Sequence, residues 1–205
     1  MNKQARIAVL VSGGGTNLQA LIDAQASGAL TSGSIELVIS NNESAYALQR
    51  AQKANIDTRV IMKKDCGSQE GFEQKIMNTL SECAIDVIVL AGFMSILSEK
   101  FTGAYPKRII NVHPSLIPSF CGKGFYGLRV HEAALSYGVK VTGATVHFVN
   151  EIPDGGEIIL QKAVAIRPND TPESLQKRVM QQAEWKILPK AVEQVCAALI
   201  KGKEN

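Results

Sequence analysis

Short apolar runs alternate along the chain with segments whose apolar residues recur at helical spacing. Continuous aliphatic runs are typical of parallel strands that are buried on both faces, and a period near 3.6 predicts a helix. The runs predict strands at residues 7–11, 35–39, 58–62, 85–90 and 109–113, with helices at 18–26, 44–54, 69–83 and 97–101. This repetition of strand and helix predicts an α/β fold with a doubly wound, mostly parallel, Rossmann-like sheet. The run at 85–90 is the most hydrophobic, so we expect it at the centre.

The last third of the chain has a different pattern. After a predicted helix at 127–137, residues 139–149 and 158–166 mix small, polar and apolar residues, which favours mixed or antiparallel strands at the C-terminal end of the sheet. Thr171 and Pro172 are typical of an N-cap and a first helical residue, so a final helix should run to about residue 200, with an interruption near Pro189. No linker or repeat divides the sequence, and we expect residues 1–205 to form a single domain.

Composition and charge argue against several kinds of partner and site. The net charge of +3 and the 5% of aromatic residues give little reason to expect a nucleic-acid partner, and no apolar run could cross a bilayer. Residues 1–6 are polar and lack a signal-peptide pattern, so we expect a cytoplasmic protein. The cysteines are scattered without a C-x-x-C pair, so neither a metal site nor a disulfide framework is expected.

A glycine-rich loop at residues 12–18 separates the first strand from the first helix. Its glycines allow a sharp turn, and Thr16 with Gln19 fits a capping box at the start of the helix. Free N–H groups and the positive end of the helix dipole would favour an anion such as phosphate. The loop matches neither the dinucleotide fingerprint nor the Walker motif, and a tight turn without a ligand is the alternative interpretation.

Asn111 and His113 lie two residues apart in a predicted strand, so their side chains should project from the same face. Pro114 should end the strand, which places both groups at the edge where open α/β sheets bind ligands. Histidine exchanges protons near neutral pH, and an asparagine amide can donate to a developing oxyanion. His131 should lie on a helix surface, and His147 should be a hydrogen-bonded structural histidine or a support for the site.

Asp154 lies in a loop at residues 150–156 that ends in paired glycines. The simple interpretation is a hairpin turn, in which Asp-Gly is favourable chemistry. The functional interpretation is that Asp154 reaches His113 and raises the pKa of that imidazole. Spacing along the chain does not choose between the two.

Four motifs together resemble a known family. They are VSGGGTNL at residues 11–18, LAGFM at 90–94, NVHPSLIP at 111–118, and VHFV at 146–149 leading to DGG at 154–156. Over residues 7–192 the chain resembles the phosphoribosylglycinamide formyltransferases, folate-dependent enzymes of purine synthesis. The resemblance implies a formyl transfer from the co-substrate 10-formyltetrahydrofolate to the amine of a phosphorylated small molecule. It implies no metal, no nucleic-acid or membrane partner, and a monomer or homodimer.

The resemblance also implies roles for individual residues. Asn111, His113 and Asp154 match the catalytic set, in which the imidazolium of His113 and the Asn111 amide would stabilise the oxyanion. The ribonucleotide would be bound by Gly15, Thr16, Asn17, Gln181 and Glu184. The folate would be bound by Gln69, Met94, Ser95, Ile96, Leu97, Asn111 and Glu151.

Some residues depart from the family pattern, and other functions compete with formyl transfer to the ribonucleotide. Ser95 and Gln69 stand at or near positions that are often arginine in relatives, and the loop at 121–127 is longer than in some of them. A formyltetrahydrofolate deformylase and a methionyl-tRNA formyltransferase share the catalytic motif, but we expect further domains in both. A non-catalytic nucleotide-binding module would explain the glycine loop and leave Asn111, His113 and Asp154 without a role.

Overall fold

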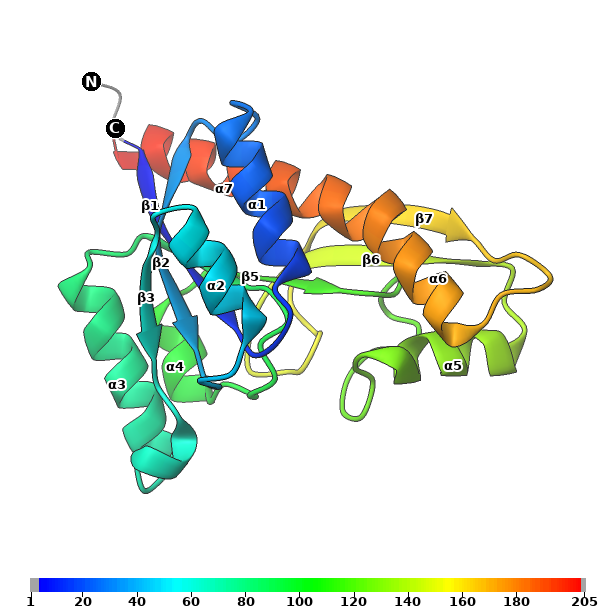
Figure 1. The fold of residues 1–205 in the computed structure, drawn as a ribbon, viewed down its shortest axis with the longest axis horizontal. Coiled ribbons are helices and arrows are strands. Elements are labelled where there is room, and N and C mark those ends of the chain that lie inside the picture. Colours follow the sequence, from blue (N-terminus) through cyan, green and yellow to red (C-terminus); the bar gives the residue numbers. More distant parts are fainter. Residues whose placement is uncertain (1–3, 204–205) are drawn as a thin grey trace.

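A computed structural model describes residues 4–203 and contains a seven-stranded sheet in the order β3-β2-β1-β4-β5-β6-β7. The first five strands along the chain run parallel, while β6 is antiparallel to β5 and β7 to β6. The predicted mostly parallel sheet with antiparallel C-terminal strands is therefore confirmed, and β4 is the central strand, as expected (Figure 1). The strands are β1 Ala5–Val11, β2 Gly33–Ser40, β3 Asp57–Val60, β4 Val87–Leu90, β5 Ile109–His113, β6 Val141–Phe148 and β7 Ile158–Ala165.

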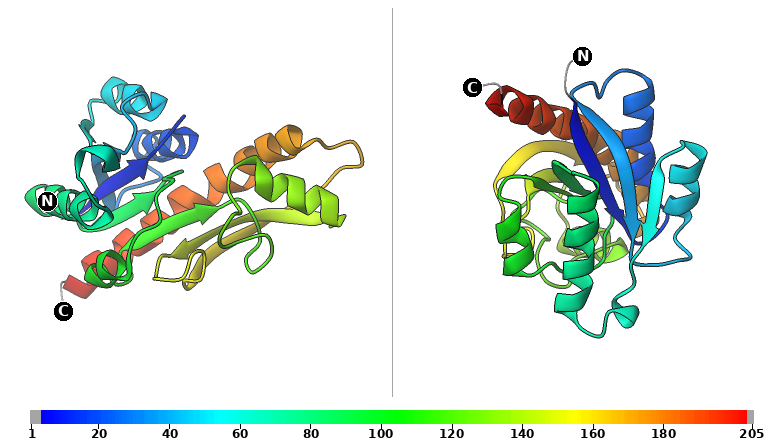
Figure 2. Two further views of the ribbon diagram at one scale, coloured as in Figure 1. Left: turned by 90° about the horizontal axis from the view of Figure 1, so that it is seen from below. Right: turned by 90° about the vertical axis from the view of Figure 1, so that its left-hand side faces the viewer.

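Helices cover both faces of the sheet because the strands carry apolar side chains on both. Alternate residues of β1 contribute to different cores: Ile7 and Val9 pack with α1, α2, α6 and α7, whereas Ala8 and Leu10 pack with α3 and α4. Figure 2 shows α1 and α2 on one side of β1 and β2, with α3 on the other. The helices are α1 Thr16–Ala26, α2 Tyr46–Lys53, η1 Lys63–Asp65, α3 Gln69–Glu82, α4 Glu99–Ala104, α5 Leu128–Tyr137, α6 Pro172–Val179, η2 Met180–Glu184 and α7 Trp185–Lys203.

The last helical segment begins as predicted, but it is interrupted at a different position from the one predicted. The Thr171 side chain accepts from the Ser174 N–H in a capping box, with Pro172 at the first position. The interruption is the π-helical segment η2, whereas Pro189 lies inside α7, so the prediction of a break near Pro189 was wrong. Wider π-type turns concentrate at functional sites, and η2 carries Gln181 and Glu184.

The topology brings distant segments to one edge of the sheet. Strands β1, β4 and β5 are neighbours and parallel, so the segments that follow them open at the same carboxyl edge. The strand order reverses between β1 and β4, and ligands of open α/β sheets bind in the crevice at such a switch point. The hydroxyl of Ser12, just after β1, accepts from the Met94 N–H at 2.8 Å, which links the segments that follow β1 and β4.

Candidate active site

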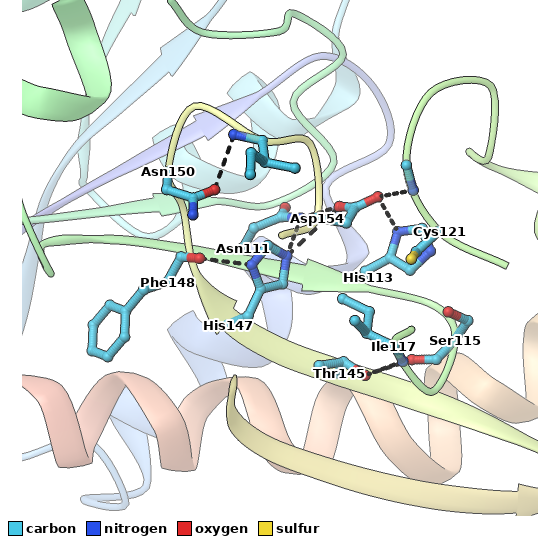
Figure 3. A network of polar contacts seen from close by, with 12 residues as sticks. Asn111, His113, Ser115, Ile117, Cys121, Thr145, His147, Phe148, Asn150 and Asp154 are labelled. Atoms are coloured by element: carbon cyan, nitrogen blue, oxygen red, sulfur yellow. Dashed lines mark hydrogen bonds and ion pairs between the residues drawn. The ribbon is translucent and has the colours of Figure 1, made fainter. Parts of the chain in front are cut away.

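Polar side chains from β5, β6 and the loop at residues 150–156 meet at this edge. Asn111 and His147 lie directly opposite each other in the β5–β6 pairing, and Asn111 Nδ2 lies 3.2 Å from His147 Nε2. Asp154 Oδ1 is 3.5 Å from Asn111 Nδ2, and Asp154 Oδ2 is 3.5 Å from His113 Nδ1. Figure 3 shows these side chains turned toward Asp154. The structure therefore brings Asn111, His113 and Asp154 together, so Asp154 does not serve only as a turn residue.

Asp154 is held at the centre by the backbone and by several donors. Its φ of 56° lies in the left-handed region, which aspartate enters more often than most residues other than glycine. The Gly122 N–H donates to Oδ2 at 2.8 Å, and His147 Nε2 lies 3.6 Å from Oδ1. Burial alone would raise the pKa of Asp154, but His147, His113 and the Gly122 N–H outweigh it and lower the pKa below its ordinary value. The group is therefore a carboxylate at neutral pH.

His113 is buried between two oxygen acceptors. Nε2 lies 2.9 Å from the Phe120 carbonyl and Nδ1 faces Asp154. Burial lowers the pKa of His113 below its ordinary value, and the nearby Asp154 carboxylate and the Phe120 carbonyl oppose this without reversing it. Asp154 therefore acts on the pKa of His113 in the expected direction, but desolvation of the imidazolium is the larger effect and the net pKa lies below its ordinary value.

Of the other two histidines, His147 agrees with its prediction and His131 does not. His147 is 2% exposed and belongs to the cluster, donating from Nδ1 to the Phe148 carbonyl at 2.8 Å. His131 is fully buried in α5 rather than on its surface, and among the described residues neither ring nitrogen has a hydrogen-bond partner. Burial lowers the pKa of His131 to about 4, with a contribution from His113. Only the β5–β6 register could have assigned His147 to the site.

Two cavities adjoin the cluster. The smaller, about 130 Å³, has an apolar wall and includes Asn111, His147, Asp154 and four residues predicted to bind folate: Ser95, Ile96, Leu97 and Glu151. The larger, about 570 Å³, lies between Met94 and the segment at residues 122–127 and also reaches His113 and Asp154. Met94 and Ile96 are more than half exposed at these cavities. The structure thus places these predicted residues around the cluster.

The residues that depart from the family pattern are held by neighbouring polar groups. The Ser95 hydroxyl accepts from Asn41 Nδ2 at 3.0 Å. Gln69 lines neither cavity, and its amide donates to the Ile96 carbonyl at 3.1 Å and to Glu73 at 2.6 Å. Gln69 therefore supports the cavity wall from outside.

The glycine-rich loop leads into α1 through Gly15, the N-cap residue, at φ 70°. No side chain caps this helix, so the predicted capping box of Thr16 and Gln19 is wrong. Gln19 instead bonds to Asp23 and Arg50. A Cβ at Gly15 would lie 2.6 Å from the Ala47 Cβ, so both the backbone conformation and the packing require glycine. The uncapped N–H groups of the first turn remain free for an anion.

Two residues of η2, Gln181 and Glu184, were predicted to bind the ribonucleotide. Of these, Glu184 contacts the start of the helix that follows this loop. Asn17 Nδ2 donates to Glu184 Oε2 at 2.7 Å, which joins the first turn of α1 to η2. Burial raises the pKa of Glu184 to about 7, and the Asn17 hydrogen bond opposes the rise. Gln181 is exposed on the same segment, and no hydrogen bond among the described residues joins it to the loop.

Within residues 4–203, no group of three or more His, Cys, Asp or Glu side chains is arranged to hold a metal ion. None of the helices described is long and apolar enough to span a membrane. The cysteines at positions 66, 83, 121 and 196 are free thiols.

Comparisons with known proteins agree with the geometry. Residues 5–192 match a family described as formyl transferase. The chain is 45% identical over 203 residues to the trifunctional purine biosynthetic protein adenosine-3 of Homo sapiens. The matched region is 99% of this chain but only 19% of that protein. It is 41% identical over 200 residues to the phosphoribosylglycinamide formyltransferase of Haemophilus influenzae, covering 98% and 91% of the two chains. Glycinamide ribonucleotide transformylase 1 from Symbiobacterium toebii has a similar structure, with a TM-score of 0.89 at 38% identity, covering 95% of this chain and 89% of that one.

Proposed function

Because this chain belongs to the formyl transferase family, we propose that it transfers the formyl group of 10-formyltetrahydrofolate to the amine of 5'-phosphoribosylglycinamide in purine biosynthesis. The observation that carries the proposal is the meeting of Asn111, His113 and Asp154 beside a cavity with apolar walls, at the sheet edge where the uncapped helix α1 also begins. The Haemophilus influenzae relative of matching length is named for this activity. That similarity favours transfer over the deformylase and nucleotide-binding alternatives.

The smaller cavity suits a flat heterocycle with polar edges. Leu90, Leu97 and Val149 form apolar walls, while Asn150 and Glu151 add polar groups along one side. Binding sites of this kind are typically apolar with a few placed polar groups that fix orientation. The pterin would occupy this cavity, and the formyl group would then lie beside Asn111 and Asp154.

The phosphate of the ribonucleotide would bind at the other end. The N–H groups at the start of α1 and the dipole of that helix favour a dianion there. Asn17 and Glu184 would contact the ribose, and Gln181 would approach it from the exposed side of η2. This arrangement directs the glycyl amine toward His113.

In the reaction, Asn111 and His113 would stabilise the developing negative charge, and Asp154 would handle the proton. The co-substrate supplies the formyl group, and the free amine attacks its carbon, so that a C–N bond forms as the carbonyl oxygen becomes negative. The Asn111 amide and a protonated His113 would donate to that oxygen, and each such donor typically contributes about 3 kcal/mol. Asp154 would accept the proton released by the amine and pass it to the folate nitrogen as the bond from that nitrogen to the formyl carbon breaks and the oxyanion returns to a carbonyl.

The ionisation state of Asp154 supports its role, whereas His113 must gain its proton as the reaction proceeds. Asp154 has a lowered pKa and is a carboxylate, as an acceptor must be. His113 has a lowered pKa, yet its two nitrogens face the Phe120 carbonyl and Asp154, which are both acceptors. Negative charge developing on the formyl oxygen favours the imidazolium further, so protonation of His113 would accompany the reaction.

A coupled assay tests the proposal. Release of tetrahydrofolate should depend on added 5'-phosphoribosylglycinamide, and formylated product should form in equal amount. Release that is independent of the ribonucleotide would identify a hydrolase instead. Calorimetry with a folate analogue adds a second criterion, because a plain nucleotide-binding module would give no heat of folate binding.

A further inference from the structure

His147 is part of the polar cluster and has no role in the reaction described above. Its side chain is 2% exposed and contacts Asn111, Asp154 and the Phe148 carbonyl (Figure 3). Burying an imidazole at a strand position costs free energy unless its polar atoms are satisfied. All of its ring polar atoms do have partners, and those partners determine where the proton lies.

The Phe148 carbonyl fixes the tautomer of His147. A carbonyl oxygen only accepts hydrogen bonds, so His147 Nδ1, at 2.8 Å, must carry the proton. The neutral ring then presents a lone pair at Nε2. The nearest group to Nε2 is Asn111 Nδ2 at 3.2 Å, which can only donate.

The tautomer in turn fixes the orientation of Asn111. A carboxamide has two orientations, related by a half-turn, that exchange its NH2 and its oxygen. In the neutral tautomer with its proton on Nδ1, His147 Nε2 is an acceptor like Asp154 Oδ1, and both face Asn111 Nδ2, at 3.2 and 3.5 Å. A second proton on Nε2 would instead place a donor 3.6 Å from Asp154 Oδ1. With these neighbours the NH2 points into the cluster, whereas a proton on His147 Nε2 would favour the opposite orientation.

We propose that His147 is a positioning residue that holds the Asn111 carboxamide with its NH2 toward the formyl oxygen. The inference rests on the proposed formyl transfer. One hydrogen of the NH2 stays on His147, while the other makes only the long 3.5 Å contact to Asp154 and is free to donate to the developing oxyanion. The transition state, rather than the bound substrate, gains from this orientation.

The backbone makes the arrangement specific. Asn111 and His147 are direct cross-strand partners, so their side chains share one face of the sheet. The register of β6 against β7 shifts between Val146 and His147, an irregularity of the kind that re-aims a side chain next to a site. A Cβ at Gly156 would overlap the Phe148 carbonyl oxygen, so glycine is required where the loop passes the group that fixes the tautomer.

Two substitutions at His147 separate the acceptor from the ring. His147→Leu removes the acceptor, and we expect kcat to fall by about 30-fold with KM values within about twofold, since removal of an oxyanion donor itself costs about 100- to 1000-fold. His147→Gln can present an oxygen to Asn111 and should recover most of the lost kcat. Val146→Ala, at a fully buried neighbour that faces the other core, is the matched control: it should lower Tm without lowering kcat.

A double-mutant cycle gives the decisive comparison. If His147 acts through Asn111, His147→Leu should change kcat by less than about threefold in an Asn111→Ala background. An undiminished loss in that background would overturn the proposal, as would a His147→Gln variant that is as slow as His147→Leu. Should the leucine variant not fold, His147→Phe takes its place in the same cycle, because it keeps a ring at this position while removing the acceptor.

The tautomer can be measured in the wild-type protein without any assay of turnover. Nitrogen-15 NMR of histidine-labelled protein should show His147 protonated at Nδ1 and unprotonated at Nε2 at neutral pH. A ring protonated at Nε2 would overturn the proposal even if formyl transfer is confirmed. Conversely, absence of formyl transfer in the wild-type assay would remove the proposed function and leave the tautomer measurement valid.

Discussion

The glycine-rich loop and the polar cluster lie at the same edge of the sheet but are built in different ways. The loop at residues 13–17 is one contiguous segment that offers backbone N–H groups, and its key residue, Gly15, has no side chain. The cluster takes its functional groups from β5, β6 and the loop at 150–156, and it offers only side chains. The first depends on local conformation and close packing, and the second on strand register.

This difference predicts different responses to mutation. Backbone N–H donors remain when most side chains are substituted. The loop should therefore be sensitive mainly to substitutions that add atoms where neighbouring atoms leave no room. Each member of the cluster contributes a distinct donor or acceptor, so removal of one should reduce catalysis more than stability. Substitutions in the two regions test this contrast directly.

The largest effect is expected for His113→Ala. The variant loses the donor to the oxyanion, so kcat should fall by about 1000-fold while ribonucleotide affinity stays within about threefold. Steady-state kinetics together with calorimetric binding of the ribonucleotide measure both. Near-normal turnover would remove His113 from the mechanism, and a matching loss of affinity would erase the contrast between the two regions.

Asp154→Asn should have the next largest effect. It removes the proton acceptor, so kcat should fall by about 100-fold. The carboxylate raises the pKa of His113 against the effect of burial, and its loss should lower that pKa further. NMR titration of the His113 ring measures the shift. An unchanged or higher pKa in the variant would show that Asp154 does not act on this imidazole.

Gly15→Ala tests the loop. The added Cβ meets Ala47 and the residue must keep φ 70°, so the free energy of unfolding should fall by about 2–4 kcal/mol and KM for the ribonucleotide should rise. Gly13→Ala is the matched control: a Cβ there meets no atom within 4 Å and stability should change by about 0.5 kcal/mol or less. Urea denaturation of both variants makes the comparison, and equal losses would contradict the packing argument.

Glu184→Gln comes last because its effect is expected only as a change in how stability depends on pH. The pKa of Glu184 is about 7 in the folded protein, above its value in the unfolded chain, so its contribution to stability is full below about pH 4.5 and declines as pH rises through 7. Between pH 5 and 8 the wild type should lose about 2–4 kcal/mol relative to the glutamine variant. Parallel pH series of urea denaturation measure this difference, and parallel curves would refute it.

The sequence by itself determined the order of strands and helices, the central place of β4 and the position of the glycine loop. These features follow from local rules: aliphatic runs bury strands on both faces, and Gly-rich turns lead into helices. The motif around Asn111 and His113 also located part of the cluster, because residues two apart in a strand share a face. The motifs, taken together, further indicated the family.

Only the tertiary structure decided the rest. The β5–β6 register places His147 against Asn111, and the fold of the 150–156 loop brings Asp154 to both. Burial, which no local pattern measures, lowers the pKa of His113 and makes His131 a buried residue without partners among those described. The N-cap of α1 is Gly15 rather than Thr16, and close packing against Ala47 leaves room only for glycine there. Each outcome depends on contacts between segments far apart in the chain, and local hydrophobic periodicity carries no information about those contacts.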